Sequence, residues 1–383
     1  MPSQPLDGVR VIDLTRLLPG AYATLLLADL GADIVKIEDP HGGDPSRTLP
    51  PVRGGTGAYF EVLNRNKRSV TLDLRSPDAA PVLDAVLARA DVVIESFRPQ
   101  TARRLGVDAE TLRARHARLI CASVSGFGRT GPMAERAAHD INFEALTGLL
   151  ADPPKVPGML IGDIGAALHA AAGILGALFQ RERTGTGAAV EVSIQDAALS
   201  WLLVPAALRL AGSNDPDAVD LPVDGGNACY NIYRTADGRF VALGALEPKF
   251  WTIFCRRIGR PDLVALQYAG GTQQASVLDA VRTLMLTRTQ NEWLTSFADV
   301  DVCLTPVVGV GDVLADPKLE KRGTVVRHQG RTYVTSPIVM TSSGAARVPV
   351  RPAPALGADT ETVLAEAGVG ADERARLRER GII

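Results

Sequence analysis

The stretch that decides the fold is VRVIDLTRLLPGAYATLLLADLGADIVKIED, residues 9–39. It contains an apolar strand pattern, a loop with Pro19 and Gly20, an apolar helix pattern that ends at Gly31, and a second strand pattern. Proline is tolerated in the first turn of a helix, and glycine readily adopts the left-handed backbone that follows a helix end. The stretch therefore predicts a strand, a helix and a second strand parallel to the first.

The same alternation continues towards the C-terminus. Strand patterns recur at residues 69–74, 91–97, 119–127 and 188–194, and helix patterns at 77–90, 108–119, 163–183 and 195–212. Strands that alternate with helices are typical of a parallel sheet covered by helices on both faces. We expect an α/β protein whose large domain contains a doubly wound, Rossmann-like sheet.

A change of composition marks the end of this pattern. Residues 213–226, SNDPDAVDLPVDGG, are rich in Asp, Pro and Gly, and the following NIYRTADGRFVALGAL predicts a hairpin that turns at Asp237 and Gly238. The predicted organisation is a large α/β domain over residues 1–200, a linker over 201–226, a small α+β domain over 227–304, a second linker over 305–325, and a C-terminal segment over 326–383.

Composition argues against several classes of protein. The 41 Lys and Arg residues face 43 Asp and Glu residues, so no basic field exists to hold nucleic acid. The four cysteines are scattered without a CxxC pair, which indicates neither a disulfide framework nor a thiolate zinc site. The N-terminus has no basic segment followed by an apolar one. We expect a cytoplasmic protein without a membrane partner.

The loop after the first strand argues against a dinucleotide. A doubly wound sheet binds ligands at the carboxyl ends of its strands, and a dinucleotide there needs a G-x-G-x-x-G loop. Residues 15–20 read TRLLPG instead, with bulky side chains where the glycines would stand. Glu38 is placed where a ribose-binding acid would fall, but acids at strand ends are common.

Candidate chemistry lies in polar residues that precede apolar helix patterns. His139 and Asp140, in AAHDINF, place an imidazole and a carboxylate at a helix start, although they also fit a loop residue and a helix cap. Asp163, in IGDIG, is either another cap or a carboxylate beside amides that can hold an oxyanion. Glu247 precedes Pro248, and an acid at a helix start needs no special function.

Taken together, several segments resemble the family III CoA-transferase superfamily. They are PLDGVRVIDLTRLLPGAYATLLLADLGADIVKIEDP, NRNKRSVTLDL, DVVIESFRPQTARRLG, SGFGRTGP and ALGADTETVLAEAG, spread from residue 5 to residue 368. Within the superfamily, AHDINF resembles the GHDINY motif of the α-methylacyl-CoA racemase branch, and ALEPKF resembles a segment of the same branch. Transferases of the superfamily usually lack the histidine of this motif.

The resemblance assigns roles to these residues. Inverting the carbon α to a thioester needs two acid/base groups on opposite faces, which the resemblance identifies as His139 and Asp163. Asp140 and Glu247 would orient this pair, Glu247 by pairing with the imidazole and Asp140 by bonding to Asp163. Amides at the helix start near Asp163 would stabilise the enolate oxygen.

The resemblance also implies how CoA is held. Its binding residues would be Leu72, Arg75, Arg98, Arg104, Ala138 and Asn142, although each arginine alone also fits an exposed solubilising role. CoA enters as part of the acyl-CoA substrate, so no separate cofactor is expected, and no metal-ligand spacing is visible.

The implied assembly is an interlocked homodimer of two ring-like subunits, closed by the two linkers. The large domain, residues 1–200, would bind CoA, and the C-terminal segment, residues 326–383, would return to it. Each active site would lie between the large domain of one subunit and the small domain of the other. The function expected is racemisation of 2-methylacyl-CoA thioesters in lipid metabolism. The alternatives are a CoA-transferase that forms an acyl-aspartyl intermediate on Asp163, and a non-catalytic CoA-binding protein.

Two departures from the racemase pattern have expected consequences. Gly165, Ala166 and Ala167 stand where racemases of the family often carry a glycine run, and we expect them to narrow the acyl pocket. Asp39 stands near the end of the second strand, where an arginine is frequent. We expect the acid there to repel a phosphate of CoA.

Overall fold

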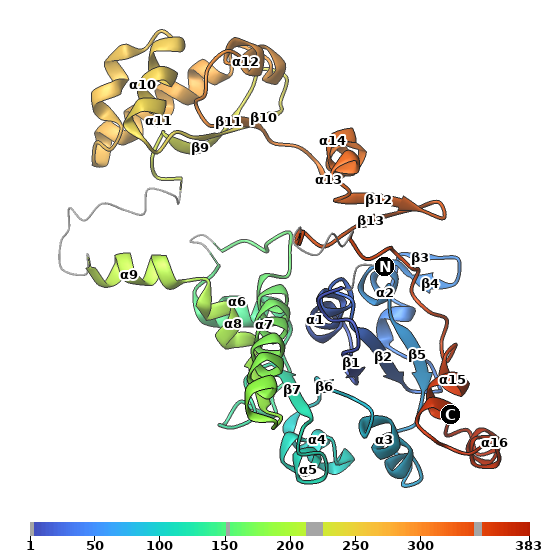
Figure 1. Cartoon of the computed structure of the whole chain (residues 1–383). Coiled ribbons are helices and arrows are strands. Elements are labelled where there is room, and N and C mark those ends of the chain that lie inside the picture. Colours follow the sequence, from blue (N-terminus) through green and yellow to red (C-terminus); the bar gives the residue numbers. More distant parts are fainter. Residues whose placement is uncertain (1–3, 151–153, 212–224, 341–346) are drawn as a thin grey trace. The chain divides into compact units, whose positions relative to one another are not determined.

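The computed structural model describes residues 4–150, 154–211, 225–340 and 347–383 (Figure 1). The chain divides into two compact units. Unit 1 comprises Met1–Leu202 with Lys318–Ile383, and unit 2 comprises Leu203–Pro317. Half of the predicted first linker, residues 212–224, lies outside the described residues.

Unit 1 is built on a six-stranded sheet with the order β5-β2-β1-β6-β7-β8. All neighbouring strands are parallel, which confirms the predicted doubly wound sheet. The strands are β1 (Arg10–Asp13), β2 (Asp33–Glu38), β5 (Arg68–Thr71), β6 (Val92–Glu95), β7 (Ile120–Ser125) and β8 (Ala189–Ser193).

Helices connect these strands. They are α1 (Leu18–Ala28), α2 (Ala58–Asn64), α3 (Ala79–Leu87), α4 (Pro99–Leu105), α5 (Ala109–Arg115), α6 (Asp140–Thr147), α7 (Ile161–Thr184) and α8 (Ile194–Ser200). Smaller elements of the unit are η1 (Pro45–Arg47), the strand pair β3 (Val52–Arg53) and β4 (Thr56–Gly57), and the strand pair β12 (Val325–His328) and β13 (Arg331–Val334).

Each face of the sheet carries its own core. The neighbours Val11 and Ile12 on β1 are both fully buried, but they belong to different clusters, because successive side chains of a strand point to opposite faces. One cluster packs α1 and α7 against the sheet, and the other packs α3 and the C-terminal helices. Burying each such side chain contributes about 1.5–3 kcal/mol.

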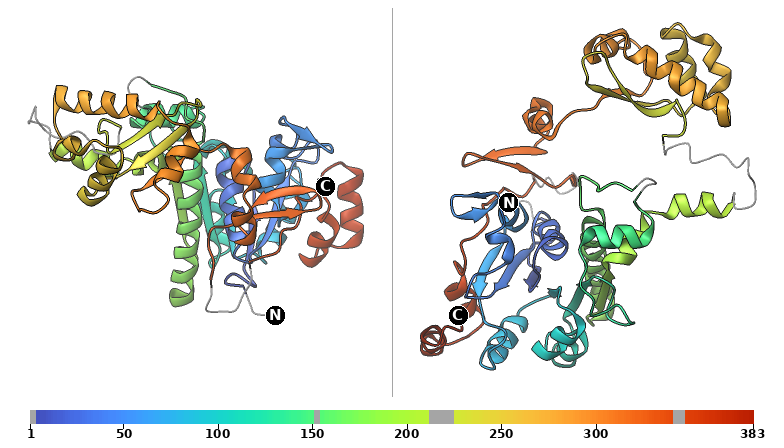
Figure 2. Two further views of the ribbon diagram at one scale, coloured as in Figure 1. Left: turned by 90° about the horizontal axis from the view of Figure 1, so that it is seen from above. Right: turned by 180° about the vertical axis from the view of Figure 1, so that it is seen from behind.

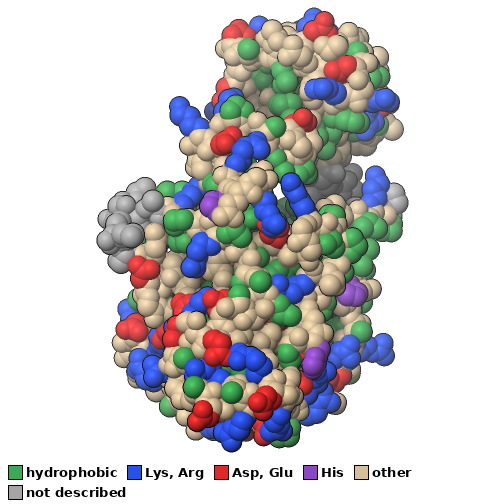
Figure 3. Space-filling model, turned by 90° about the vertical axis from the view of Figure 1, so that its right-hand side faces the viewer, with side chains coloured by type: hydrophobic (Ala, Val, Ile, Leu, Met, Phe, Trp, Pro, Cys, Tyr) green, Lys and Arg blue, Asp and Glu red, His purple; other side chains and the backbone are tan. Residues whose placement is uncertain are grey.

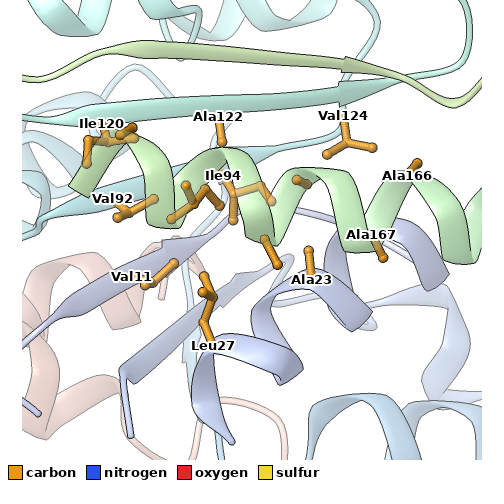
Figure 4. Packing of buried hydrophobic residues seen from close by; sticks show 14 of the residues in the cluster. Val11, Ala23, Leu27, Val92, Ile94, Ile120, Ala122, Val124, Ala166 and Ala167 are labelled. Carbon is orange, nitrogen blue, oxygen red and sulfur yellow. The ribbon is translucent and has the colours of Figure 1, made fainter. Parts of the chain in front are cut away.

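Ala166 and Ala167 lie in the first of these cores (Figure 4). Both are 0% exposed, and they pack with Ala23 and Leu27 of α1. The expectation that these residues narrow the acyl pocket is therefore wrong, because their methyl groups fill the contact of α7 with α1 and the sheet. Gly165 is also enclosed, since a Cβ there would come within 2.7 Å of Trp201 Nε1.

Helix α7 is the longest of unit 1 and is drawn green in Figure 2. Among the described residues it is the one helix long and apolar enough to cross a membrane. Half of its most apolar window is buried inside the protein, as in a core helix. Its contacts with α1, β7 and β8 identify it as the central packing element of this face.

The helix pattern predicted over residues 195–212 is divided into two helices. Helix α8 ends at Ser200, and α9 (Leu203–Ala211) begins three residues later. The proline at position 205 explains the break, because in a continuous helix its ring would clash with the carbonyl of Trp201. At the third position of a new helix its missing N–H has no consequence.

The C-terminal residues of the chain pack on unit 1. Helix α15 (Thr360–Glu366) buries Val363 and Leu364 in the core shared with α3, and α16 (Ala371–Glu379) follows it. The amide of Asp73 donates to the carbonyl of Ile382 at 2.8 Å. Figure 2 shows these red helices beside the blue strands at the β5 edge.

Unit 2 contains a three-stranded antiparallel sheet, β11-β10-β9. The predicted hairpin is present between β9 (Tyr230–Arg234) and β10 (Phe240–Gly244), and Gly238 in its turn has a φ of 77°. The other elements are α10 (Pro248–Arg257), η2 (Pro261–Leu266), α11 (Gly271–Met285), α12 (Gln290–Ser296), β11 (Leu304–Pro306) and α13 (Val310–Ala315), before α14 (Pro317–Lys321) leads back to unit 1. The core includes Trp251, whose ring stacks on Phe254 at 5.6 Å.

Charged side chains of both signs are interspersed over unit 1 on the face drawn in Figure 3. That face has no broad area of basic side chains alone, which nucleic-acid binding would need.

Candidate active site

The AHDINF segment forms the start of α6. His139 is the residue before the helix, with an exposed side chain and extended backbone, and Asp140 is the first helical residue and is buried. Asn142 caps this end, because its Oδ1 accepts the His139 N–H at 3.0 Å. The local sequence thus exposes the imidazole while it turns the neighbouring carboxylate inwards.

Asp163 lies in the first turn of α7, directly against α6. Its backbone N–H donates to Asp140 Oδ1 at 2.8 Å. The close approach depends on Gly162, because a Cβ there would lie 3.1 Å from Asp140 Oδ1 and 3.4 Å from Ile194 Cγ2. The structure therefore brings Asp163 to Asp140, 23 positions earlier in the sequence and next to His139.

The Asp163 carboxyl is half-buried among other acids. Burial is the largest cause that raises its pKa, and the negative charges of Asp140 and Glu144 add to it, so that its pKa is about 7. A carboxyl group with this pKa is partly protonated at neutral pH. It can both accept and donate a proton there, which acid/base catalysis requires.

Glu144 is a site residue that the sequence analysis missed. It lies one helical turn after Asp140, is 0% exposed, and accepts the Ile161 N–H on Oε1 at 3.2 Å. Burial and a side-chain hydrogen bond with Asp140 raise its pKa to about 7. Residues 140, 143, 144 and 147 form the buried face of α6. The available signal was a second acid one helical turn after Asp140, next to Phe143 on the same face.

Tyr59 on α2 is a second missed residue. Burial raises the pKa of its phenol first, and the charges of Asp163, Asp44 and Asp140 raise it further. The phenol therefore stays protonated and can donate a hydrogen bond close to Asp163. Nothing in the sequence around AYFEVLN distinguishes this tyrosine from a core residue.

The amides at the start of α7 are mostly occupied. The N–H groups of Ile161 and Asp163 donate to carboxyl groups of α6, and the Ile164 N–H donates to the Leu160 carbonyl at 3.0 Å. The expectation that amides here stabilise an enolate oxygen therefore rests on the one that remains. Within the described chain, the Gly162 amide is the first-turn N–H without a protein acceptor.

A separate cavity of about 270 Å³ lies at the carboxyl ends of β1, β2 and β5. Leu72, Arg75 and Arg104, three of the predicted CoA-binding residues, line it. Arg16, Phe97 and Thr101 line it as well and were not predicted. This is the place where doubly wound sheets bind their ligands, because the connections diverge there.

The other three predicted CoA-binding residues do not line this cavity. Arg98 is exposed at the start of α4, Ala138 packs at the edge of the core that α6 shares, and Asn142 caps α6. Ala138 and Asn142 belong to the α6 site instead, next to His139.

Arg75 modifies the repulsion that Asp39 is expected to exert on a CoA phosphate. Asp39 Oδ2 lies 3.1 Å from Arg75 Nη2, and Asp73 Oδ1 lies 2.8 Å from Arg75 Nε. All three side chains line the cavity. The guanidinium thus offsets the charge of Asp39, and Arg75 shares its own charge between two acids.

Buried ion pairs form the floor of the cavity. Lys36 Nζ lies 3.0 Å from Asp44 Oδ2 and donates to the Thr15 carbonyl at 2.7 Å. Asp44 Oδ2 also accepts the N–H of Leu17, whose φ of 59° is in the region that favours glycine. These bonds hold the β1–α1 loop in a strained form at the ligand-binding end of the sheet.

Glu247 lies in unit 2, where its side chain is exposed just before α10. It belongs to a different unit from the α6–α7 cluster. A cavity of about 540 Å³ on the sheet of unit 2 is lined by Tyr230, Ile232, Cys303 and their neighbours. Burial raises the pKa of the Cys303 thiol, and the charges of Asp301 and Glu247 add to this effect.

No group of three or more His, Cys, Asp or Glu side chains suited to a metal ion occurs in the part of the chain that the structure describes. The clusters described above consist of paired or protonated acids and offer no such ligand set.

Comparison with known proteins identifies the family. A family model described as CoA-transferase family III matches residues 6–360, so the chain belongs to this family. It is 31% identical to the α-methylacyl-CoA racemase of Homo sapiens, over 99% of this chain and 97% of that protein. It is 34% identical to the succinyl-CoA–D-citramalate CoA-transferase of Chloroflexus aurantiacus, over 85% of this chain and 84% of that protein.

A solved structure supports the fold. The crystal structure of a CAIB/BAIF family protein from Brucella suis matches with a TM-score of 0.82 and 30% identity, over 95% of this chain and 99% of that chain. The relatives carry both racemase and CoA-transferase names. The family resemblance seen in the sequence is confirmed, and the relatives' names leave both reactions open.

Proposed function

We propose that the protein is a racemase that inverts the α-carbon of 2-methylacyl-CoA thioesters. The observation that carries this proposal is the cluster at the start of α6 and α7, where an exposed imidazole adjoins a buried pair of acids and Asp163 has a pKa of about 7. Two groups that exchange protons near neutral pH are what inversion without a cofactor requires.

The proposed reaction is a transfer of two protons. One base removes the α-proton from one face of the thioester, and the electron pair of the broken C–H bond moves into an enolate. The acid on the other face returns a proton to the same carbon. His139 and Asp163 exchange these roles for the two enantiomers, so the substrate and the product have the same composition.

The enolate oxygen needs a hydrogen-bond donor. The amide of Gly162 is suited to this role, because the neighbouring amides of Ile161 and Asp163 already donate to carboxyl groups. A donor aimed at a developing oxyanion contributes about 2.7–4 kcal/mol to a barrier in enzymes where it has been measured. The protonated Tyr59 phenol lies in the same electrostatic environment and is a second candidate.

The CoA part would bind in the cavity at the carboxyl ends of the strands. Arg75 and Arg104 provide positive charge for its phosphates, and Leu72 provides an apolar wall. We propose that no metal or further cofactor takes part, because the thioester itself acidifies the α-proton. We also propose a cytoplasmic location and a role in lipid metabolism.

We further propose that Glu247 acts from a second copy of the chain, in an interlocked homodimer. Glu247 and His139 both have exposed side chains within their own units, so each is accessible to another subunit. Helix α9 also leaves Leu203 and Leu210 78% exposed, and an apolar helix surface of this kind is typical of an interface.

A CoA-transferase is the second candidate. Its support is the transferase relative at 34% identity, together with Asp163, which stands where the family's covalent nucleophile is expected. In this reaction the Asp163 carboxylate attacks the thioester carbonyl and CoA leaves as the thiolate. An exposed histidine next to Asp140 would have no role in that sequence.

The deciding experiment is incubation with a single enantiomer of a 2-methylacyl-CoA in deuterated water, without an added carboxylate. We expect deuterium at the α-carbon together with inversion. His139→Ala should slow inversion by about 10²-fold, which is typical for loss of a positioned acid/base group. In a parallel incubation with added succinate, transfer of CoA to succinate, with Asp163 trapped by hydroxylamine as an acyl derivative and no α-exchange, would establish the transferase instead.

A further inference from the structure

The first turn of α7 is held from outside by two carboxyl groups of α6. Asp140 accepts the Asp163 N–H at 2.8 Å, and Glu144 accepts the Ile161 N–H at 3.2 Å. The two acids are four residues apart, so they lie on the same face of α6. The first amides of a helix have no intrahelical partner and attract negative charge. Helix α6 therefore provides the N-terminal cap of α7 and fixes the backbone of Asp163.

The second oxygen of Glu144 explains how both acids fit there. Glu144 Oε2 is buried and has no protein donor in the described chain. Two ionised carboxylates cannot hydrogen-bond to each other, but a single proton allows one to donate to the other. A proton on Oε2 satisfies this oxygen, since Glu144 and Asp140 share a side-chain hydrogen bond. It also avoids two adjacent negative charges in a buried place.

We propose that Glu144 is a positioning residue that works as a neutral acid: its Oε2–H donates to Asp140 while its Oε1 accepts the Ile161 N–H. The pair then carries one negative charge and binds the two amides that set the place of Asp163. The inference rests on the proposed function only in that Asp163 acts on the substrate.

The shared proton of Glu144 and Asp140 affects Asp163 because of the groups that surround the pair. Asp163 faces it from α7, Tyr59 approaches from α2, and α8 presents the apolar side chains of Ile194 and Ala198 to Gly162. The two neighbouring groups that raise the pKa of Asp163, Asp140 and Glu144, are both acids. Loss of the Glu144 proton therefore places a second negative charge near Asp163 and makes its carboxyl hold its proton more tightly.

Two substitutions separate the hydrogen bonds from the charge. Glu144→Gln keeps a donor for Asp140 and an acceptor for Ile161, but it cannot ionise. Glu144→Leu fills similar space and has neither group. We expect kcat within about threefold of wild type for Glu144→Gln and a loss of about 10²-fold for Glu144→Leu with little change in KM, because a misplacement of about 1 Å can have that effect.

Thr147→Val is the matched control. Thr147 lies on the same buried face of α6, and its hydroxyl bonds only to carbonyls of its own helix, at 2.9 Å to Phe143 and 3.2 Å to Glu144. It should lower thermal stability without a change in kcat. A loss of kcat for Thr147→Val equal to that for Glu144→Leu would overturn the proposal, since it would mean that any disturbance of α6 suffices.

A second readout does not depend on the reaction. Carbodiimide labels protonated carboxyl groups, so the pH midpoint of Asp163 labelling, followed by peptide mass spectrometry, reports its proton affinity. This midpoint should stay the same in Glu144→Gln and in Thr147→Val, because a neutral glutamic acid and a glutamine both place no charge near Asp163. A lower midpoint in Glu144→Gln would show that Glu144 is ionised in wild type, and either this result or an inactive but folded Glu144→Gln would overturn the proposal.

The labelling also separates this proposal from the proposed function. If wild type transfers CoA and does not exchange the α-proton, the racemase assignment fails, while the labelling midpoint of Glu144→Gln and the transferase kcat of the two variants still test Glu144. If Glu144→Leu does not fold, the midpoint of Glu144→Gln decides.

Discussion

The acids between α6 and α7 and the charges beneath the β1–α1 loop are both buried in unit 1, but their neighbours differ. Asp163 is surrounded by acids, and its pKa is raised to about 7. For Asp13, burial raises the pKa, but the charges of Lys36 and Lys67 together with hydrogen bonds from Thr15 and Thr24 outweigh burial and lower it to about 2.

The difference shows what burial alone cannot decide. A buried carboxylate with cations and hydroxyls around it stays ionised at every physiological pH, so it serves as a fixed structural charge. A buried carboxyl among like charges exchanges its proton near neutral pH, so it can take part in chemistry. Asp13 and Asp163 are one residue type in two such settings.

The largest expected effect is on catalysis at Asp163. Asp163→Asn keeps the shape and the backbone N–H bond to Asp140, but it cannot exchange a proton. Inversion of the substrate should slow by about 10⁴-fold, the upper part of the range for acid/base groups. Steady-state kinetics measure this effect, and melting temperatures confirm that the variant is folded. Activity within tenfold of wild type would show that Asp163 is not an acid/base group of the reaction.

The next effect is on stability at Asp13. Asp13→Asn leaves Lys67 buried with weaker compensation, since Lys67 Nζ lies 3.1 Å from Asp13 Oδ2 and both side chains are 0% exposed. We expect a loss of about 3–5 kcal/mol in the free energy of unfolding, as for a broken buried ion pair, measured with denaturant.

The control is Asp279→Asn at the exposed pair with Arg282. Such a pair is worth less than about 1 kcal/mol. Equal losses for the two variants would contradict the structural role assigned to the buried network.

A third prediction concerns pH. Asp163 has a folded pKa of about 7, above its usual 3.8, so the folded state holds more protons between these values. The stability that this proton provides is lost as pH rises from about 4 to 7. Asp163→Asn should therefore be stabilised relative to wild type at pH 8 but not at pH 4, as measured by thermal unfolding.

For Asp13 the sign is opposite. Its folded pKa of about 2 lies below the usual 3.8, so its stabilisation is complete above about pH 4 and is lost as pH falls through 2. The difference between Asp13→Asn and wild type should be constant from pH 5 to 8. If this difference in stability instead changed with pH between 5 and 8, as expected for Asp163→Asn, the proposed distinction between the two sites would be wrong.

The smallest effect is expected at the exposed edge of the cavity. Asp39→Asn releases Arg75 from one of its two acidic partners, which strengthens its attraction for a CoA phosphate. Exposed pairs are worth about 0.2–1 kcal/mol, so KM for acyl-CoA should fall by less than about fivefold, with kcat unchanged. A rise of KM would mean that Asp39 helps to place Arg75.

Much of the fold was predictable because its signals are local. The alternation of strands and helices, Gly31 and the turn at Asp237 and Gly238 follow from hydrophobic periodicity and backbone preference. The break between α8 and α9 was not predicted, although the proline at position 205 is its cause. An apolar pattern that runs across a proline near a helix start is compatible with one helix or two.

The candidate site was predictable only in part. His139, Asp140 and Asp163 were identified by their places at helix starts and by the family motif, and Leu72, Arg75 and Arg104 do share a cavity. Arg98 lies outside it, and Ala166 and Ala167 lie in the core. Helix periodicity does not say which neighbour covers each face, so the sequence alone could not place these side chains.

The sequence by itself determined the order of the elements, the parallel sheet and the family, because periodicity, turn residues and motifs are properties of the chain. Only the tertiary structure decided the protonation behaviour of the acids. A pKa depends on burial and on charges within a few ångströms, and the neighbours of Asp163 come from another helix, 19 and 23 positions earlier in the chain. The same distinction explains why Glu144 became visible only once α6 lay against α7.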